Sequence, residues 1–205
     1  MSNFNKYISK INQSLKTIDQ DSIDQCFCEI LSRVNSSNNI YLLGNGGSQA
    51  NAHHIAGDFI KTFSVAGLKL KISCLADNVC FMTAASNDYS FEDAYSLLVG
   101  TIIDEGDLLV YLSGSGNSIN LVKCARKAKS QNIKQIAITG YSGGALNSIV
   151  DLPIHVKIDD MEIAEDAQLI IFHFLKQKLV NHFKDKFSNT TGFKYNKRVT
   201  EDLIS

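Results

Sequence analysis

The start of the chain has the hydrophobic pattern of two amphipathic helices. Over residues 4–18, apolar side chains recur three and four positions apart, which is the spacing of one helix face. Residues 22–34 repeat this pattern, and the polar run at 35–39 ends it. We therefore predict an N-terminal helical pair ahead of the main body of the fold.

After residue 39, short apolar runs alternate with helical segments. The apolar runs predict strands at residues 40–43, 68–74, 107–112, 135–139 and 152–156. Helices are expected in the segments between them, at about 48–63, 91–103 and 119–130, and a long one at about 162–183. This alternation is typical of βαβ units, so we predict an α/β fold with a five-stranded parallel sheet between two layers of helices.

Length and charge limit the organisation and the partners of the protein. A chain of 205 residues, 44% of them hydrophobic, suits one core. We expect helices over 1–36, the core over 37–185 and a polar tail over 186–205. The 20 Lys and Arg residues nearly balance the 21 Asp and Glu residues. This balance gives no general attraction to nucleic acid or to an anionic membrane, so local geometry must hold any bound anion.

Cysteine usage and the N-terminus indicate the compartment. The five cysteines are odd in number and form no paired CxxC motifs, which favours free thiols in a reducing compartment. The first ten residues are polar and lack the apolar core of a signal peptide. No apolar run approaches the length of a membrane span, and we expect a cytoplasmic protein.

Two loops rich in glycine and serine each follow a predicted strand and open a helix. They are Gly44-Asn45-Gly46-Gly47-Ser48 and Ser113-Gly114-Ser115-Gly116-Asn117-Ser118. Their glycines admit a ligand close to the backbone, and the helix-start N–H groups and serine hydroxyls suit an anion. Neither loop has the third glycine of a dinucleotide fingerprint or the lysine of a P-loop. One such loop can be an ordinary turn, but two at corresponding strand ends favour phosphate binding.

Candidate acid–base residues lie on two predicted helices. His54 and Asp58 are four positions apart and share a helix face. Such a pair is more often a surface hydrogen bond, but the nearby loop favours a functional role. His53 points about 100° away, and we expect it to make subunit or solvent contacts.

The long C-terminal helix carries a second set of candidates. Glu165 precedes His173 by eight positions, but Asp166 is better aligned with His173 around the helix. A histidine within an apolar run is usually a satisfied core residue, and the spacing alone does not join this helix to the first pair.

Taken together, these motifs resemble the phosphoheptose isomerases of the sugar isomerase (SIS) domain superfamily. The resemblance covers the chain to about residue 184 and includes both loops, His54, Asp58, Asn87-Asp88, Glu165 and His173. It implies a single SIS domain that acts as an aldose–ketose isomerase. The expected reaction converts sedoheptulose 7-phosphate to D-glycero-D-manno-heptose 7-phosphate through an enediol, for surface polysaccharide.

The resemblance also implies roles for particular residues. Asp58 and His173 are the expected catalytic pair, and His54, Asp58, Glu165 and His173 the expected zinc ligands. The substrate and its phosphate are expected to contact Asn45, Gly46, Gly47, Ser48, Asp88, Ser113, Gly114, Ser115, Asn117, Ser118 and Glu165. A homotetramer with active sites at its subunit interfaces is the expected assembly.

Three positions depart from the family pattern. Asp58 stands where glutamate is common, Glu165 where some members have glutamine, and Gln168 where histidine often occurs. These changes keep the chemistry in kind but leave open an isomerase of another sugar phosphate. A third alternative is a non-catalytic SIS protein that binds a sugar phosphate or has a regulatory role. The retained histidines and carboxylates argue against it, because a binding module needs only the serines.

Overall fold

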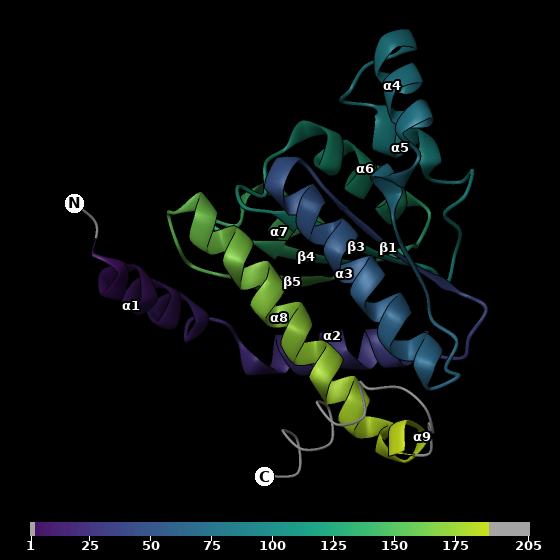
Figure 1. Ribbon diagram of the computed structural model, residues 1–205. Helices are drawn as coiled ribbons and strands as arrows, with labels where there is room; N and C mark the ends of the chain where they lie inside the picture. Colours follow the sequence, from purple (N-terminus) through teal and green to yellow (C-terminus); the bar gives the residue numbers. More distant parts are fainter. Residues whose placement is uncertain (1–2, 189–205) are drawn as a thin grey trace.

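A computed structural model gives the fold, and residues 3–188 are the part of the chain that the structure describes (Figure 1). A single five-stranded sheet forms its centre. The strands are β1 (Asn39–Gly44), β2 (Lys71–Cys74), β3 (Leu108–Ser113), β4 (Lys134–Thr139) and β5 (Leu152–His155). All pairings are parallel, in the order β2-β1-β3-β4-β5. The predicted parallel sheet is confirmed, although β2 begins three residues later than expected.

The strand order reverses between β1 and β3, and this places helices on both faces. From β1 the chain crosses to β2 through α3 (Gly46–Val65), and from β3 it crosses the other way to β4 through α6 (Ile119–Ser130). Because such crossovers are right-handed, opposite directions put the two helices on opposite faces. The loops after β1 and β3 therefore meet at the switch point, where ligands bind in open α/β sheets.

Each face has its own set of helices. On one face α8 (Met161–His182) packs against both α3 and α2 (Gln20–Leu31), and Figure 1 shows α3 and α8 side by side. On the other face α6 contacts α5 (Ala94–Leu98) and α7 (Gly144–Ile149). The short helix α9 (Lys184–Ser188) follows α8.

Aromatic side chains fix α3 against α8. Phe59 lies 5.9 Å from Phe63 and 6.0 Å from Phe172, measured between ring centroids. All three rings are at most 1% exposed, and fully burying one such side chain contributes about 1.5–3 kcal/mol. The two helices therefore hold the polar residues beside these rings at a fixed spacing.

The N-terminal helical pair is confirmed, with shorter helices than predicted. The first, α1 (Phe4–Leu15), buries only Ser14, while Phe4 and Ile8 on its apolar face are exposed. Polar contacts hold α1 against α8. The Tyr7 hydroxyl donates to Asp166 of α8 at 2.7 Å, and Lys10 pairs with Asp160, the N-cap residue of α8, at 3.3 Å. The division at residues 36 and 185 remains an expectation, and residues 189–205 of the predicted tail lie outside the described part.

The predicted helix over 91–103 is wrong. Only α5 forms there, because Val99 is extended and Gly100 takes a positive φ of 80°. The chain instead forms a 3-10 turn, η1 (Leu75–Asp77), and α4 (Val79–Asp88), where no helix was predicted. α4 buries only Ala85, so its sequence has no apolar stripe. The sequence feature that marks the start of α4 is the N-cap residue Asn78, whose side chain accepts from the Phe81 N–H.

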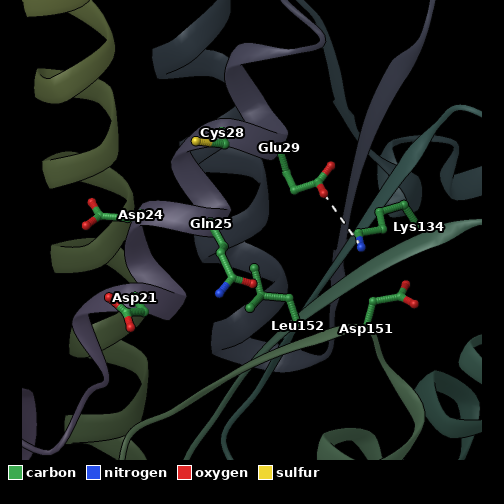
Figure 2. Close-up of a pocket in the computed structure, with 8 residues that line it drawn as sticks. All are labelled: Asp21, Asp24, Gln25, Cys28, Glu29, Lys134, Asp151 and Leu152. Atoms are coloured by element: carbon green, nitrogen blue, oxygen red, sulfur yellow. Dashed lines mark ion pairs between the residues drawn. The ribbon is translucent and has the colours of Figure 1, made fainter.

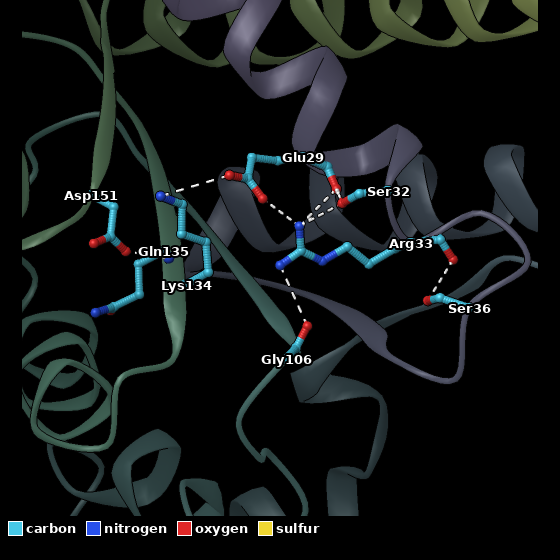
Figure 3. A network of polar contacts seen from close by, with 8 residues as sticks. All are labelled: Glu29, Ser32, Arg33, Ser36, Gly106, Lys134, Gln135 and Asp151. Carbon is cyan, nitrogen blue, oxygen red and sulfur yellow. Dashed lines mark hydrogen bonds and ion pairs between the residues drawn. The ribbon is translucent and has the colours of Figure 1, made fainter.

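A polar network fastens α2 to the amino edge of the sheet (Figure 3). The Arg33 guanidinium pairs with the Glu29 carboxylate and donates to the Gly106 carbonyl at 3.4 Å. Glu29 also lies 3.6 Å from the Lys134 ammonium at the start of β4. These contacts tie the end of α2 to the start of β4 and to the segment that leads into β3. In the described part of the chain, no helix combines the length and apolar character that crossing a membrane requires.

Candidate functional site

The two glycine- and serine-rich loops enclose one cavity of about 270 Å³, which we call the anion cavity. They meet because β1 and β3 are paired, with Gly44 opposite Leu112. The cavity is lined by Asn45, Gly46, Gly47, Ser48, Leu112, Ser113, Gly114, Ser115, Ser118, Met161 and Glu165. Nine of the eleven residues expected to contact the substrate line this cavity. Asn117 and Asp88 do not line it.

Hydrogen bonds orient the serine hydroxyls around the anion cavity. The Ser48 oxygen accepts from the Gln168 amide at 3.1 Å, and the Ser113 oxygen accepts from the Gly116 N–H at 3.1 Å. The Ser115 oxygen accepts from the Asn117 N–H at 3.2 Å. A hydroxyl whose oxygen accepts a bond keeps its own proton for donation. Three serines can therefore each donate to an anion.

The loop after β3 rests on the loop after β4. Gly116 has a φ of 65°, and a Cβ there would lie 2.0 Å from the Gly143 carbonyl oxygen. The Leu146 N–H donates to the Gly116 carbonyl at 3.0 Å, and the Ala145 N–H donates to the Asn117 side chain at 2.9 Å. The Asn117 side chain thus contacts the first turn of α7 and does not line the cavity.

Gln168 and Glu165 bring α8 to the cavity. Gln168 is 1% exposed, and its oxygen accepts from the Asn51 amide at 3.0 Å while its nitrogen donates to Ser48. Gln168 thus positions Ser48, a role that its sequence position, a departure from the family pattern, does not indicate. The Glu165 carboxylate lies against Gly47, where an added Cβ would be 2.3 Å from its oxygen. Glu165 therefore places a negative charge at a cavity otherwise suited to anions.

A second polar group lies where α3 meets α8. His54 and His173 face one another, with 3.2 Å between their Nε2 atoms, and their rings are T-shaped. Ligand atoms of His54, Asp58 and His173 all lie within 4.8 Å of one another. We call these three residues the seam group. The structure thus brings together three of the four expected zinc ligands within one chain.

Beside the seam group lies a cation that the sequence did not suggest. The Lys176 ammonium is bonded to the Asp58 carboxylate, and Lys61 lies 3.7 Å from its other oxygen. The side chains of Lys176 and Asp58 are only 14% and 12% exposed. Lys176 follows His173 by three positions, and this helical spacing is the signal that could have revealed it.

These charges set the protonation of the seam group. Burial alone would raise the pKa of Asp58, but the hydrogen bond and charge of Lys176, with the charge of Lys61, bring it below its ordinary value. Burial lowers the pKa of His173, and the positive charge of Lys176 lowers it further, against the opposing effect of Asp58. At neutral pH, His173 is therefore a neutral imidazole beside an ionised carboxylate.

The carboxylates of Glu165 and Asp166 have different surroundings. Glu165 enters the anion cavity, and Asp166 accepts from Tyr7 on α1. Neither belongs to the seam group, although Asp166 is aligned with His173 along α8. Eight residues of helix separate Glu165 from His173, a distance of about 12 Å. The cavity and the seam group are thus separate places in one chain.

A larger cavity, of about 390 Å³, lies at the opposite edge of the sheet (Figure 2). Its lining includes four carboxylates, those of Asp21, Asp24, Glu29 and Asp151. The single lysine of the lining, Lys134, is already paired with Glu29. This concentration of negative charge opposes phosphate, so the cavity does not compete with the two loops as an anion site.

His53 reaches a different set of side chains from His54. Its Nε2 lies 2.8 Å from the Asp77 carboxylate and its Nδ1 lies 2.8 Å from the Gln49 carbonyl. Cys74, at the end of β2, completes a group whose ligand atoms lie within 4.8 Å of one another. Burial raises the pKa of the Cys74 thiol to about 11. His53 was expected to contact solvent or another subunit, and it contacts η1 of its own chain while remaining 40% exposed.

Comparison with known proteins shows which family the chain is similar to. The family model described as "SIS domain" matches residues 3–140. A probable phosphoheptose isomerase of Thermoplasma volcanium is 31% identical over 169 residues, which are 82% of this chain and 86% of the relative. The structure of a phosphoheptose isomerase from Francisella tularensis superposes with a TM-score of 0.78 at 26% identity, covering 84% of this chain and 92% of that one. The phosphoheptose isomerase structure from Neisseria gonorrhoeae gives 0.77 at 25% identity, covering 85% and 94%.

Proposed function

The chain belongs to the SIS-domain family and, within it, to the phosphoheptose isomerases; on that basis we propose that it isomerises sedoheptulose 7-phosphate to D-glycero-D-manno-heptose 7-phosphate. One observation supports this assignment most strongly. The same chain carries an anion cavity with three oriented hydroxyls and a seam group with two facing imidazoles and a carboxylate. A protein that only binds a sugar phosphate needs the first and has no use for the second.

The anion cavity is the proposed phosphate site. Ser48, Ser113 and Ser115 donate their hydroxyl protons to phosphate oxygens, while the N–H groups at the start of α3 stabilise its negative charge. Ser118, at the N-cap of α6, lines the same cavity and is the fourth proposed donor. Because these donors are uncharged, this mode of binding agrees with the near-zero net charge of the chain.

The proposed proton transfers use His173 and Asp58. Neutral His173 takes the proton from C1 of the ketose, which leaves an enediolate, and returns a proton to C2. Asp58 carries the O1 proton to O2, so that C1 becomes the aldehyde and C2 the alcohol. Lys176 supplies positive charge close to Asp58, which opposes the accumulation of negative charge during the reaction.

The seam group fits zinc. Two nitrogen ligands of a tetrahedral zinc ion lie about 3.3 Å apart, and the Nε2 atoms of His54 and His173 are 3.2 Å apart. Asp58 supplies the oxygen donor of the same proposed site. A bound zinc ion would polarise the carbonyl and stabilise the enediolate. Because it would occupy the Nε2 lone pair of His173, zinc binding and proton transfer through that atom are alternative uses of the seam group. Glu165 lies in the anion cavity, so we assign it to the substrate and not to this metal.

We further propose a homotetramer in which one protomer completes the site of another. Six residues of α3, or about 9 Å of helix, separate Ser48 from His54, so the cavity and the seam group of one chain are apart. Exposed apolar side chains lie on the two helices that carry the seam group: Ile60 on α3 is 48% exposed, and Ile170 and Phe174 on α8 are 40% and 46% exposed. Such a surface supports contact with a second copy, and a molar mass from light scattering tests the assembly.

The decisive experiment follows hydrogen exchange at carbon. The protein is incubated with sedoheptulose 7-phosphate in heavy water, with and without zinc, and followed by proton NMR. We expect an aldose phosphate carrying deuterium at C2, formed by the wild type and by His182→Gln but not by His173→Ala. If phosphate raises the melting temperature but no exchange occurs, the sugar or the catalytic assignment is wrong. If phosphate has no effect on melting, the assignment of the loops fails as well.

A further inference from the structure

His53, Cys74 and Asp77 form a cluster of three different donor types at the carboxyl edge of the sheet. We call these residues the flank group, since they lie on the side of α3 away from the seam group. His53 comes from α3, Cys74 ends β2 and Asp77 ends η1. They converge because α3 is the crossover between the paired strands β1 and β2. Their ligand atoms lie within 4.8 Å of one another.

The His53 ring is held with one nitrogen directed into the cluster. Its Nδ1 lies 2.8 Å from the Gln49 carbonyl oxygen, which can only accept, so Nδ1 carries the hydrogen of this bond. The Nε2 atom is then directed at Asp77, 2.8 Å away. Histidines that bind metals commonly donate their other N–H to a backbone carbonyl in this way, which fixes the tautomer and the ring.

The donor set favours a particular class of metal. Imidazole nitrogen and thiolate sulfur suit zinc and similar transition metals, whereas magnesium and calcium prefer oxygen ligands. Three protein ligands also leave a fourth position of a tetrahedral ion for water. Cys74 is 2% exposed and the side chains of His53 and Asp77 are 40% and 55% exposed, so the sulfur lies on the inner side and the other two donors face solvent.

We propose that His53, Cys74 and Asp77 bind a divalent transition metal ion, separately from the seam group and from the proposed isomerase chemistry. The metal would join α3 to the segment that leads into α4, because Asp77 directly precedes the N-cap residue Asn78. It shares no ligand with the seam group, although His53 and His54 are neighbours in the chain. The site therefore depends neither on the sugar nor on the catalytic assignment.

Cobalt spectroscopy tests this site without any assay of activity. The parent protein carries His54→Ala and His173→Ala, which removes two seam ligands, and Cys28→Ser and Cys80→Ser, which removes the two exposed thiols. We expect Co²⁺ to produce a near-ultraviolet thiolate-to-metal absorption band that saturates at one equivalent. Cys74→Ser should abolish the band, and Asp77→Asn should weaken cobalt binding about 10-fold.

Two controls make the outcome decisive. Cys124→Ser removes another buried thiol and should leave the band unchanged, and circular dichroism verifies that each variant is folded. An excess of zinc should remove the band by competition, and an excess of magnesium should not. The proposal is overturned if the folded parent gives no band, or if the band survives Cys74→Ser.

Discussion

Two neighbouring histidines on α3 serve two donor groups of different character. His54 belongs to the seam group, in which nitrogen and oxygen donors lie beside the ammonium groups of Lys176 and Lys61. His53 belongs to the flank group, in which a sulfur atom accompanies nitrogen and oxygen. Adjacent helix positions differ by about 100°, which is enough to direct the two rings to different elements of the fold.

The difference in local charge separates the expected chemistry of the two groups. A cation that binds the seam group must share the Asp58 carboxylate with Lys176, whereas in the flank group the Asp77 carboxylate faces the imidazole of His53. We therefore expect weak, exchangeable metal binding at the seam and tighter binding of soft metals at the flank. The seam keeps a neutral imidazole and an ionised carboxylate for proton transfer.

The largest expected effect is the loss of turnover when a seam imidazole is removed. His173→Ala should lower kcat by about 10²–10⁴-fold, the usual contribution of a positioned acid–base group. Steady-state kinetics on sedoheptulose 7-phosphate measures it. The control is His182→Gln on the same helix, whose ring packs on Phe27 and Phe183. A His173→Ala enzyme with more than a tenth of the wild-type kcat would contradict the catalytic role of the seam.

The second largest expected effect concerns zinc affinity and the ammonium group of Lys176, which pairs with Asp58. Lys176→Met should tighten zinc binding at the seam by about 10-fold, because loss of a unit charge near a carboxylate changes its interactions by about 1 kcal/mol or more. The Cys74→Ser background disables the flank group, so competition with a chromogenic chelator reports on the seam alone.

The matched control for this variant is Lys178→Met. Lys178 lies on the same helix but pairs with Asp24 on α2, so its loss should leave zinc affinity unchanged. Equal zinc affinities in Lys176→Met and Lys178→Met would show that Lys176 does not compete for Asp58.

A smaller effect distinguishes the two carboxylates at 165 and 166. Glu165→Gln removes a negative charge from the anion cavity and should strengthen the binding of inorganic phosphate by about 5-fold. Asp166→Asn, whose side chain lies against Tyr7, should not change it. Isothermal titration calorimetry measures both. Weaker phosphate binding by Glu165→Gln would mean that Glu165 positions a donor instead of repelling the anion.

The smallest effect lies at the contact between α1 and α8. The hydrogen bond to Asp166, with lesser contributions from burial and from neighbouring acidic charges, raises the pKa of Tyr7 to about 12. A folded-state pKa above the unfolded value of 10 means that this contact stabilises the fold fully below pH 10 and is lost as the pH rises through 12.

The test compares the melting temperatures of the wild type and Tyr7→Phe between pH 8 and about pH 11.5. The variant should melt roughly 1–3 °C lower at pH 8, and the difference should shrink toward pH 11.5. A difference that grows with pH would contradict the assigned sign.

The sequence allowed the sheet to be predicted because its central strands β3 and β4 are buried almost throughout and appear as apolar runs. α4 was missed because it packs too little against the core to require an apolar stripe. His54 and Asp58 were predictable as a pair, since one helix turn joins them. Their contact with His173 was not, because it depends on how α3 and α8 pack through Phe59 and Phe172.

The apolar run around His173 was also ambiguous for a physical reason. Phe172 takes the buried position, and the next residue, about 100° further round the helix, points His173 to the seam. Similarly, Asp166 has the right helical phase to meet His173, but Tyr7 of α1 binds it instead. Helical periodicity gives the faces of one helix, and the choice of partner for each face comes from the tertiary fold.

The backbone contact between Gly116 and Gly143 has a consequence for exchanging parts between relatives. The loop after β3 keeps its shape only while the loop after β4 leaves room for it, because no side chain fits where the two backbones touch. A chimera that receives only one of these loops from another family member would lack the loop that fits against it. Transplanting residues 113–118 should therefore succeed only when residues 140–147 come from the same donor, so that these two segments are inherited as one unit.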